Sequence, residues 1–514
     1  MTRTIKWLSF ILFLSALFGA GAQAQTITAA SCNTTDVQAA FNSVVSSTTT
    51  VNIPAGTCDW TTQVTLTVPS GSSSLSILGA GNLGVTGGGD ATVIVDDFAS
   101  TSALLSISTG SASSHFRLAG ITVEGGTGNS AKDNGIVAID GDSQNLRLDH
   151  CHFNGNTYTG GATFVIVKFS GWIYGVVDHS VFDSGSSVTV WMDSYNNDSF
   201  GDGSWADNTN FSGSNFLFIE NNIFSGLLSG NGTYASYVDD CSMGGRLVIR
   251  YNTMNDTGVQ THPTGGSGRI RGCRAQEIYN NTLNGSNSTP TFTAFFDSSG
   301  TALVWGNSAP VGFESLIDML SMRRDNSAYS QTAAPNGWGY CGTSFNGTGS
   351  AWDENTVTTS GYACIDQPGQ GKSDLLSGDF PNAVDTVTST LTWPHQNLEP
   401  NYEWLDTWNP VPGYSRPEIG TSDSSVLAAN RDYYQYTSSF NGTSGTGSGL
   451  LSARPSTCTP LVAYWATDTQ TLYQCATTNT WSVYYKPYVY PHPLDVTSSA
   501  TAPAAPANPV AVAY

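Results

Sequence analysis

Charged residues, and basic residues above all, are scarce in this chain. Only 11% of its 514 residues are charged, and 18 lysines and arginines stand against 39 acidic residues, giving a net charge of −21. Nucleic-acid binding depends on cations that neutralise phosphates, so this balance argues against such a partner. No cysteine or histidine spacing is typical of a zinc site. Strong helix formers are few, whereas turn residues mixed with Val, Ile, Phe, Tyr and Thr predict many short strands.

Long hydrophobic runs are also lacking beyond the first residues. Two basic residues precede the apolar run 7–18, and Ala-Gln-Ala at 22–24 forms a small-x-small cleavage site. This pattern predicts a secretory signal peptide over 1–24. A membrane anchor is the alternative, but the run is shorter than the ~20 apolar residues that cross a bilayer. We expect a mature chain that begins at Gln25, free of the membrane, in the extracellular space or the periplasm.

Nine cysteines in an exported chain predict disulfides, because oxidising compartments favour them. Sequence proximity favours three pairs and allows a fourth, and one cysteine is left over in a slot that we expect to be buried. The favoured pairs are Cys32–Cys58, Cys341–Cys364 and Cys458–Cys475, the further pair is Cys241–Cys273, and the remaining cysteine is Cys151.

A seven-residue pattern recurs along the middle of the chain. Its second position is always apolar, its last is mostly bulky and apolar, and its fifth is asparagine in the last four copies. Such repeats, with irregular connections between them, are typical of solenoid folds. The copies span 117–123, 147–153, 176–182, 218–224, 248–254 and 277–283, with a weaker copy at 303–309.

These repeats predict an all-β fold, a right-handed parallel β-helix. One coil cannot bury its own apolar face, so coils stack and bury it against each other. In-register strands place identical slots above one another, so Asn222, Asn252, Asn281 and Asn307 would hydrogen-bond as a ladder. An antiparallel sandwich or a propeller is the alternative, but irregular spacing with a fixed asparagine slot fits those folds poorly.

The two ends of the chain depart from the repeat. Residues 36–44 have the pattern of a short amphipathic helix, which would cap the open end of the stack. Near position 400 the composition shifts to Trp, Tyr and Pro. We expect a β-helix domain over 25–400, an irregular aromatic-rich cap or strap over 401–498, and a loose tail over 499–514. Packing along the helix is the favoured role of the strap's aromatics, with sugar binding as the alternative.

The third position of each repeat follows an inward apolar residue, so strand alternation assigns it to the outer face of the sheet. Carboxylates, an arginine and aromatics occupy it on successive coils, which is the composition of a sugar-binding cleft. A solvated face that merely carries charge is the alternative. The slot holds Ala119, Asp149, Asp178, Glu220, Arg250, Tyr279 and Trp305, and we expect the last four of these, together with Arg246, to bind substrate.

Five arginines gather over 246–274, far more than an even spread would place there. Arginines packed so closely repel one another unless carboxylates or an anionic ligand balance them. The alternative to anion binding is a set of arginine–carboxylate pairs that hold loops onto the helix. The arginines are Arg246, Arg250, Arg269, Arg271 and Arg274, and Glu220, Asp239, Asp240, His262 and Glu277 lie in or beside the same coils.

These motifs resemble the pectate lyase-like (pectin lyase-like) β-helix superfamily of secreted bacterial type. GVVDHSVF at 175–182 is similar to the Trp-Ile-Asp-His motif of pectate lyases, and 239–262 to their Asp, Gly-Ser, strand, Asn, His pattern. RIRGCRAQEIYNN at 269–281 resembles the Arg-x-Pro-x-x-Arg element that leads into a Tyr-Asn-Asn strand. Arg271 stands where the family has its proline, and Glu277 where those lyases usually have histidine.

The resemblance implies a uronate polymer as substrate and β-elimination as the reaction. It implies that Arg269 is the base, that Arg274 holds the substrate, and that Asp240 binds calcium. Ca²⁺, a hard ion that prefers oxygen ligands, is therefore the candidate cofactor. The expected catalytic residues are Arg269, Arg274, Arg271, Glu277 and His262, and the expected metal ligands are Asp178, Asp239 and Asp240.

Two reactions and one non-catalytic role fit these residues. In elimination, a base removes the proton α to the uronate carboxylate, and arginines or Ca²⁺ neutralise the charge that develops. In hydrolysis, a carboxylate pair such as Asp178 and Glu220 cleaves the glycosidic bond, and strands ~4.8 Å apart allow either required separation. A glycan-binding adhesin is the remaining alternative. We expect a monomeric polysaccharide lyase that acts on an anionic extracellular polysaccharide.

Overall fold

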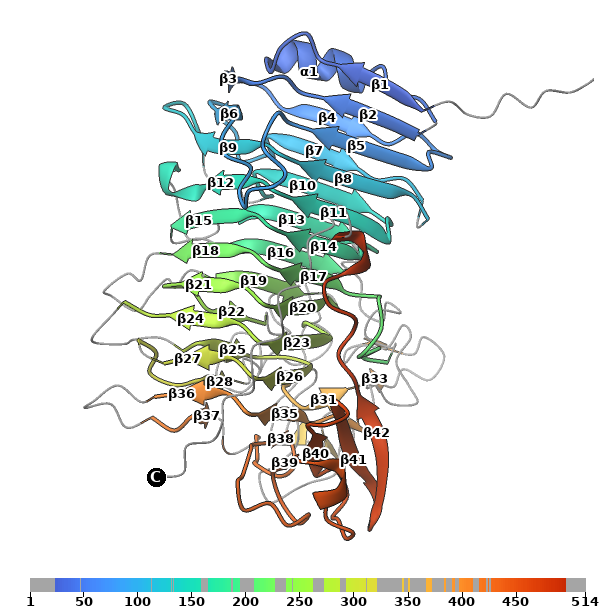
Figure 1. The fold of residues 1–514 in the computed structure, drawn as a ribbon, viewed down its shortest axis with the longest axis vertical. Helices are drawn as coiled ribbons and strands as arrows, with labels where there is room; N and C mark the ends of the chain where they lie inside the picture. Colours follow the sequence, from blue (N-terminus) through green and yellow to red (C-terminus); the bar gives the residue numbers. More distant parts are fainter. Residues whose placement is uncertain are drawn as a thin grey trace, which may run out of the picture.

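The computed structural model describes residues 24–495 with gaps, of which the longest are 195–207, 227–236, 262–271 and most of 321–396. The chain is an all-β parallel β-helix, in which successive coils add one strand to each of the stacked parallel sheets (Figure 1). The apolar side chains that point inward form one continuous core along the coil. The predicted fold class is therefore confirmed.

Sheet A, the longest sheet, has the register that the sequence repeat predicts. Glu220 pairs with Arg250, Arg250 with Tyr279, and Tyr279 with Trp305 on adjoining parallel strands. Side chains at one repeat position therefore form a row along the helix axis. The strands of sheet A are β1 (Gln25–Thr28), β2 (Thr48–Asn52), β5 (Ser74–Leu78), β8 (His115–Ala119), β11 (Asn145–Asp149), β14 (Gly175–Asp178), β17 (Leu217–Glu220), β20 (Arg246–Arg250), β23 (Ala275–Tyr279), β26 (Thr301–Trp305), β35 (Asn401–Trp404) and β38 (Tyr433–Tyr434).

From β8 onward a short turn joins sheet A to sheet B, and its first residue has a left-handed backbone. The φ angle is 51° at His150, 49° at His179 and 58° at Asn221, all of which occupy the fourth repeat position. Asparagine and histidine tolerate this conformation better than most residues do. The strands of sheet B are β3 (Gly56–Trp60), β6 (Thr92–Asp96), β9 (Thr122–Gly125), β12 (His152–Asn154), β15 (Val181–Gly185), β18 (Ile223–Gly226), β21 (Thr253–Asn255), β24 (Thr282–Asn284), β27 (Ser308–Ala309) and β36 (Thr407–Trp408).

The fifth repeat position forms the predicted asparagine ladder. The Nδ2 of Asn222 donates to Oδ1 of Asn252 at 3.2 Å, and the pairs Asn252–Asn281 and Asn281–Asn307 repeat this bond at 3.0 Å. Asp406 extends the ladder, since it accepts from Nδ2 of Asn307 at 2.8 Å. Strand β35 likewise pairs with β26 in parallel, so the structure continues the coil beyond the boundary expected near position 400.

The third wall of the coil consists of two sheets that meet at a bridge between Tyr237 and Gly258. Sheet C covers the N-terminal coils and sheet D the C-terminal coils. Sheet C holds β4 (Val64–Thr67), β7 (Leu105–Ser108), β10 (Val137–Gly141), β13 (Val165–Gly171), β16 (Val188–Ser194) and β19 (Tyr237–Ser242), and sheet D holds β22 (Val259–Gln260), β25 (Phe295–Asp297), β28 (Ile317–Met319) and β37 (Ile419–Thr421).

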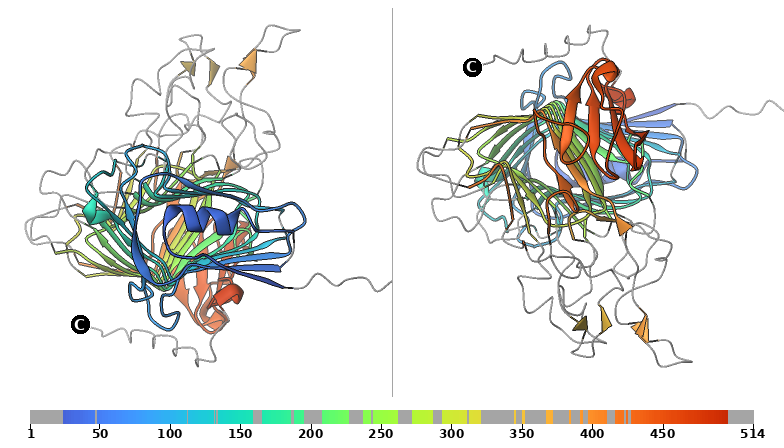
Figure 2. Two further views of the ribbon diagram at one scale, coloured as in Figure 1. Left: turned by 90° about the horizontal axis from the view of Figure 1, so that it is seen from above. Right: turned by 90° about the horizontal axis from the view of Figure 1, so that it is seen from below.

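The N-terminal end of the coil is closed by helix α1 (Thr34–Phe41), which lies over the opening (Figure 2). Val37, Ala40 and Phe41 bury the apolar side of the helix on the core. The predicted cap helix is thus confirmed, although it begins and ends earlier than the expected range 36–44. No helix among the described residues has the length and apolar character that a bilayer span requires.

The C-terminal residues form a small separate sheet and then a strap. The sheet contains β39 (Thr446–Gly449), β40 (Ala463–Ala466), β41 (Thr471–Thr477) and β42 (Thr480–Tyr485). Residues 486–495, here called the strap, then run back along the outer face of sheet A and end in the 3-10 turn η4 (Figure 1). The strands and 3-10 turns of the described chain that have not yet been named are η1 (Gly155–Thr157), β29 (Ser344–Phe345), β30 (Ser350–Ala351), β31 (Gln370–Gly371), β32 (Ala383–Val384), β33 (Leu391–Thr392), β34 (Asn397–Leu398), η3 (Leu451–Ala453) and η4 (Pro493–Asp495).

The disulfides agree with the sequence-based pairing wherever the structure describes them. The leftover cysteine is free and buried, as expected. One favoured pair, Cys341–Cys364, and the signal sequence lie outside the described residues. The observed disulfides are Cys32–Cys58, Cys241–Cys273 and Cys458–Cys475.

Candidate acid–base site

The C-terminal half of the outer face of sheet A, which we expected to be an open cleft, is covered by the strap. Arg250 donates to the main-chain carbonyls of Tyr488 and Val489 at 2.8 Å each. Glu220 accepts a hydrogen bond from the main-chain N–H of His492 at 2.7 Å and forms a buried ion pair with Arg250. The expectation of an exposed cleft at these residues is wrong, because a segment far away in the sequence occupies it.

The aromatic residues expected to bind sugar belong to a second apolar core. Tyr279 stacks on Trp305 with 4.4 Å between ring centroids, and Trp305 stacks on Trp404 at 5.7 Å. Trp465 and Tyr485 of the C-terminal sheet pack against this column. The side chains do point outward, as the repeat predicts, but this packing keeps a sugar away from them.

The described arginines of the 246–274 cluster are buried and hold protein groups. Arg246 donates to the carbonyls of Gly244 and Asn208 at 3.0 and 3.1 Å, and Arg274 pairs with Glu399 at 2.8 Å. These contacts match the structural alternative that the sequence left open. His262, Arg269 and Arg271 lie outside the described residues, so their expected catalytic roles stay predictions.

Glu277 is buried beneath the C-terminal sheet. Its carboxyl group accepts hydrogen bonds from the hydroxyl of Tyr485 at 2.7 Å and from the main-chain N–H of Ser212 at 3.2 Å. Burial raises the pKa of Glu277 to about 7 despite these two donors. Its catalytic role is untested, and the contacts seen here anchor the C-terminal sheet to the coil.

The three aspartates expected to share a calcium ion lie on different walls of the coil. Asp178 ends β14 in sheet A, whereas Asp239 and Asp240 belong to β19 in sheet C. Asp239 accepts from Nε2 of Gln276 at 2.8 Å, and burial, together with the charge of Asp240, raises its pKa well above its usual range. The structure therefore does not bring these carboxylates together around one ion.

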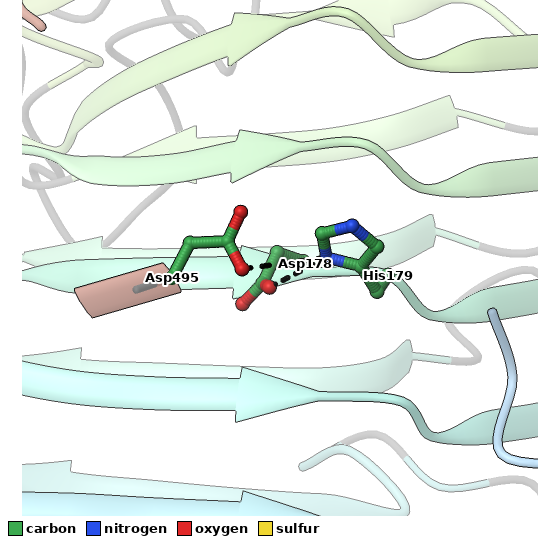
Figure 3. A group of neighbouring side chains, drawn as sticks. All are labelled: Asp178, His179 and Asp495. Atoms are coloured by element: carbon green, nitrogen blue, oxygen red, sulfur yellow. Dashed lines mark hydrogen bonds and ion pairs between the residues drawn. The ribbon is translucent and has the colours of Figure 1, made fainter. Parts of the chain in front are cut away.

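Asp178 instead joins His179 and Asp495 where the strap ends (Figure 3). One ligand atom from each of the three side chains lies within 4.8 Å of the others. The side chain of Asp178 is fully buried, while those of His179 and Asp495 are 32% and 13% exposed. We call this group the rim site, because it lies at the boundary between the covered and the open part of sheet A.

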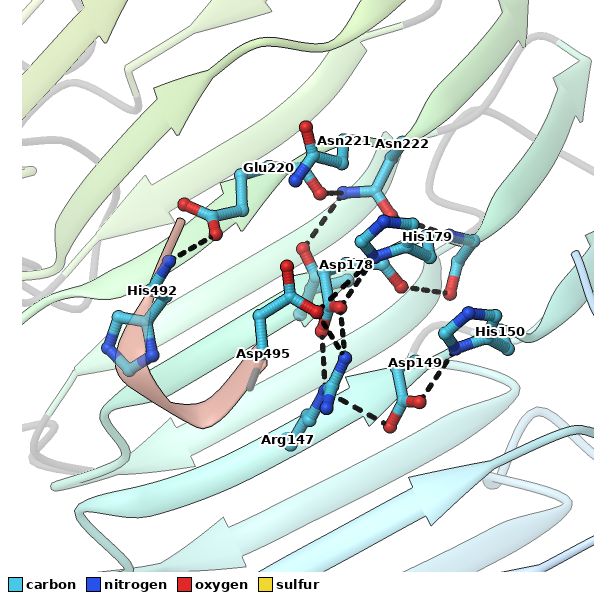
Figure 4. Close-up of polar contacts among 12 residues, drawn as sticks. Arg147, Asp149, His150, Asp178, His179, Glu220, Asn221, Asn222, His492 and Asp495 are labelled. Atoms are coloured by element: carbon cyan, nitrogen blue, oxygen red, sulfur yellow. Dashed lines mark hydrogen bonds and ion pairs between the residues drawn. The ribbon is translucent and has the colours of Figure 1, made fainter. Parts of the chain in front are cut away.

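Two Asp–His pairs repeat on adjoining coils at the rim (Figure 4). Nδ1 of His150 lies 2.7 Å from Oδ2 of Asp149, and Nδ1 of His179 lies 2.8 Å from Oδ2 of Asp178. The two imidazole rings stack with centroids 5.0 Å apart. A carboxylate at Nδ1 holds the proton on that nitrogen and leaves Nε2 as the basic atom.

Exposure distinguishes the two histidines. The side chain of His150 is 9% exposed and that of His179 is 32% exposed, so His179 offers the more accessible imidazole. Its hydrogen bond with Asp178 raises the pKa of His179 and outweighs the opposing effect of burial. The repeat thus produces two similar pairs, of which the one next to the strap faces solvent more.

Two arginines neutralise the rim carboxylates. Nη2 of Arg147 lies 2.6 Å from both Asp178 and Asp495 (Figure 4). Arg117 forms a bidentate pair with Asp149 at 2.7 and 2.6 Å. A guanidinium therefore already occupies a position between the two carboxylates where a cation would bind. This arrangement disfavours Ca²⁺ at the rim, since ion and guanidinium would compete for the same oxygens.

Asp495 has the electrostatics of a proton donor. Burial and the nearby charge of Asp178 raise its pKa to about 7, against the opposing effects of His179 and Arg147. Near neutral pH a large share of this carboxyl group therefore carries a proton. A proton donor and an imidazole thus lie side by side, with 3.7 Å between Oδ1 of Asp495 and Nδ1 of His179, the nitrogen that bonds to Asp178.

The rim site opens onto the uncovered N-terminal part of sheet A. The outward side chains of β5 and β8 there are polar and partly exposed, and include Ser74, Ser76 and Arg117. The loop 79–91 borders the site on another side, since the N–H of Gly87 donates to the carbonyl of His179 at 2.9 Å. The rim thus has partly exposed polar side chains on one side and a loop on another.

Most residues of the rim site were not among the functional residues expected from the sequence. Asp178 was expected to bind metal, but His179, Asp495 and Arg147 were not assigned a role. A signal existed for the Asp–His pairs, because Asp-His recurs at the third and fourth positions of two consecutive repeats, 147–153 and 176–182. No local signal could assign Asp495, which reaches the site through the strap.

The fold defines the class of this protein, an all-β parallel β-helix with a cap helix at one end and an added C-terminal sheet. Comparison with known proteins takes the identification no further, since no family model matches the chain and no curated protein matches it significantly. The function therefore has to be argued from the rim site.

Proposed function

We propose that this chain is a secreted polysaccharide lyase of the pectate lyase-like superfamily, which cleaves a uronate-containing glycan by β-elimination at the rim site. It would act as a monomer on an anionic extracellular polysaccharide. One observation carries the proposal: a partly exposed imidazole, held by a buried carboxylate, lies beside a carboxyl group that retains a proton near neutral pH. Three disulfides support an exported protein.

In this mechanism His179 is the base and Asp495 is the acid. Nε2 of His179 takes the proton α to the uronate carboxylate, and Asp178 stabilises the resulting imidazolium. The electron pair of the broken C–H bond forms the new double bond as the glycosidic C–O bond breaks. Asp495 gives its proton to the leaving oxygen. Because Asp495 and His179 lie 3.7 Å apart, both would act from one side of the sugar.

The negative charge that develops on the uronate carboxylate needs a counter-charge. Carboxylates already hold both rim arginines, but Arg147 is only 5% exposed, whereas Arg117 on the neighbouring coil is 21% exposed. Arg117 is therefore the cation that we assign to the substrate carboxylate. The open face of β5 and β8 would hold the neighbouring sugars.

Hydrolysis by a carboxylate pair fits this geometry less well. Asp178 and Glu220, the pair considered from the sequence, are both fully buried, and Glu220 lies beneath the strap. Asp178 is further held by Arg147 and His179. Neither carboxylate can reach a glycosidic carbon or a water beside it, as hydrolysis requires.

The test is to incubate the purified protein with uronans and neutral glycans and to follow the products. Elimination produces an unsaturated uronide that absorbs in the ultraviolet, whereas hydrolysis produces reducing ends without that absorbance. We expect elimination on a uronan, with a bell-shaped pH dependence near neutrality. The pH profile is bell-shaped because the active protonation state has a neutral His179, which acid removes, and a protonated Asp495, which base removes.

Substitutions then separate the rim site from the alternatives. H179A and D495N should each lower kcat by about 10²–10⁴-fold without a change in melting temperature. D59N is the matched control for D495N, since Asp59 is an exposed aspartate on β3 of sheet B, outside the rim site and the open face of sheet A. Full activity of H179A together with loss in R269A would instead support the arginine base that the family resemblance implies. Retention on a polysaccharide column without any product would support the adhesin.

A further inference from the structure

A second buried polar cluster lies in the N-terminal coils, away from the rim site. Lys132 belongs to the connection between β9 and β10, and Asp96 is the last residue of β6. Both side chains are 0% exposed, and Nζ of Lys132 lies 3.2 Å from Oδ2 of Asp96. Tyr158, directly after η1, places its hydroxyl 3.0 Å from the same oxygen.

The other contacts of Lys132 accommodate a neutral amine as well as an ammonium. Nζ donates to the main-chain carbonyls of Phe98 at 2.8 Å and Ser100 at 2.7 Å. A neutral amine has two N–H donors and one lone pair, so these two carbonyls leave the lone pair for the direction of Asp96. The Phe98 ring, whose centroid lies 4.9 Å from Nζ, contributes an apolar surrounding.

Burial moves both groups toward their uncharged forms. It raises the pKa of Asp96 and lowers the pKa of Lys132, and in each case the attraction between the partners does not cancel the effect. A buried ion pair often gains less from attraction than it loses in solvation. Compared with the same two groups in water, the buried pair is therefore shifted toward its uncharged form, an amine beside a carboxylic acid.

The surroundings of Asp96 can also assist acyl transfer. Oδ1 accepts a hydrogen bond from the main-chain N–H of Phe98 at 2.9 Å, which would stabilise negative charge on this oxygen in a tetrahedral intermediate. Oδ2 is held by the hydroxyl of Tyr158, which can relay a proton to it as it leaves. The nucleophile, the group that stabilises the oxyanion and the proton relay thus meet at one carboxyl group.

We propose that Lys132 and Asp96 condense to an intramolecular isopeptide bond. The lone pair of Nζ attacks Cγ of Asp96, the Nζ–Cγ bond forms, and the Cγ–Oδ2 bond breaks. Oδ2 leaves as water, taking the proton of the carboxylic acid and one proton of the amine through Tyr158. The step needs no oxidant, reductant or further reactant. The product ties β6 covalently to the connection between β9 and β10.

Such a bond would act as a disulfide does, by restricting the unfolded chain. It would close a loop between positions 96 and 132 that none of the observed disulfides closes. Unlike a disulfide, it would survive reducing agents. This inference is independent of the proposed lyase activity.

The test is tandem mass spectrometry of the full chain after reduction, denaturation and proteolysis. We expect one branched species in which the peptide containing Asp96 and the peptide containing Lys132 are joined, with a mass one water below their sum. Recovery of both peptides in linear form, with no joined species, would overturn the proposal and leave a buried ion pair.

Three variants complete the experiment. K132R replaces the amine with a guanidinium, which cannot form this amide, so it should yield linear peptides and a lower melting temperature in reducing buffer. Y158F should leave a larger linear fraction, because it removes the proton relay. K168R is the matched control, since Lys168 lies on β13 outside the cluster and its replacement should leave the joined species unchanged. A joined species in K132R with a mass one water below the sum of its two peptides would also refute the assignment.

Discussion

The two halves of sheet A share one strand register and face different surroundings. In the N-terminal half, outward side chains such as Ser76 on β5 and Arg117 on β8 are partly exposed. In the C-terminal half, the outward side chains of the same row, Phe218 and Val248, are fully buried in the second apolar core. The same repeat position thus yields surface in one half and a second core in the other, so what covers a face decides its role.

The residues at the first repeat position already differ between the halves. They are arginines in the open half, at positions 117 and 147. In the covered half they are apolar except for Glu277, and Val176, Phe218 and Val248 belong to the second core. Contiguous apolar side chains on the outer face of a sheet are usually buried by another segment. This contrast in the sequence therefore indicates that a further segment covers one half of the sheet. The rim site lies where the row changes from one kind to the other.

Removing an arginine should affect the two halves very differently. R250A should lower the free energy of unfolding by about 3–5 kcal/mol, because it leaves the buried Glu220 unpaired and removes two bonds to the strap. R117A, in the open half, should cost less, about 1–3 kcal/mol, because the buried Asp149 keeps its contact with His150. Urea denaturation of both variants measures the difference, and equal losses would contradict the division of the sheet into a covered and an open half.

Buried carboxyl groups in the two halves should make opposite contributions to the pH dependence of stability. Burial raises the pKa of Glu277 from 4.5 to about 7, so the folded protein holds this proton more tightly than the unfolded chain does. Its contribution, of about 1–3 kcal/mol, should be present below pH ~4.5 and be lost as the pH rises to about 7. E277Q should remove this loss, as urea denaturation at pH 4.5 and 7.5 would show.

Asp149 at the rim should behave in the opposite way. The hydrogen bonds from Arg117 and His150 outweigh burial and lower the pKa of Asp149, so its contribution is lost as the pH falls. D149N should therefore reduce the loss of unfolding free energy as the pH falls into the acid range, and E277Q should reduce the loss as the pH rises toward neutrality. Identical pH profiles for the two variants would show that the local surroundings do not set these pKa values.

Inside the coil, the fifth repeat position also distinguishes the halves. The covered half carries the asparagine ladder, whereas the open half has Ile121 and Cys151 in this slot. N252A should cost about 1–3 kcal/mol, because it leaves buried partners in the ladder unsatisfied. N255A in the same coil is the matched control, since Asn255 is half-buried on β21 and outside the ladder. Equal melting temperatures for both variants would refute a stabilising role of the ladder.

The smallest effect that we expect is that of a chelator. Arg147 already bridges Asp178 and Asp495, so EDTA should leave the activity of the rim site unchanged. Loss of activity in EDTA, restored by Ca²⁺, would instead support the calcium site expected near Asp239 and Asp240. Activity assays at one pH, with and without EDTA, distinguish the two outcomes.

Much of the fold was predictable because its determinants are local and repeated. The register of sheet A, the ladder from Asn222 to Asn307, the cap helix and two of the favoured disulfides all follow from patterns within or between neighbouring coils. The rim site was predictable only in part. The recurring Asp-His doublet was visible, but Asp495 comes from a segment that shares no repeat position with the coils.

The sequence by itself determined how the coils stack and which side chains point outward, because each coil's apolar face can be buried only by its neighbours. Only the tertiary structure decided which part of the outward face meets solvent. That choice depends on where the strap binds, and the contacts of Arg250 with Tyr488 and of Glu220 with His492 join residues more than 200 positions apart.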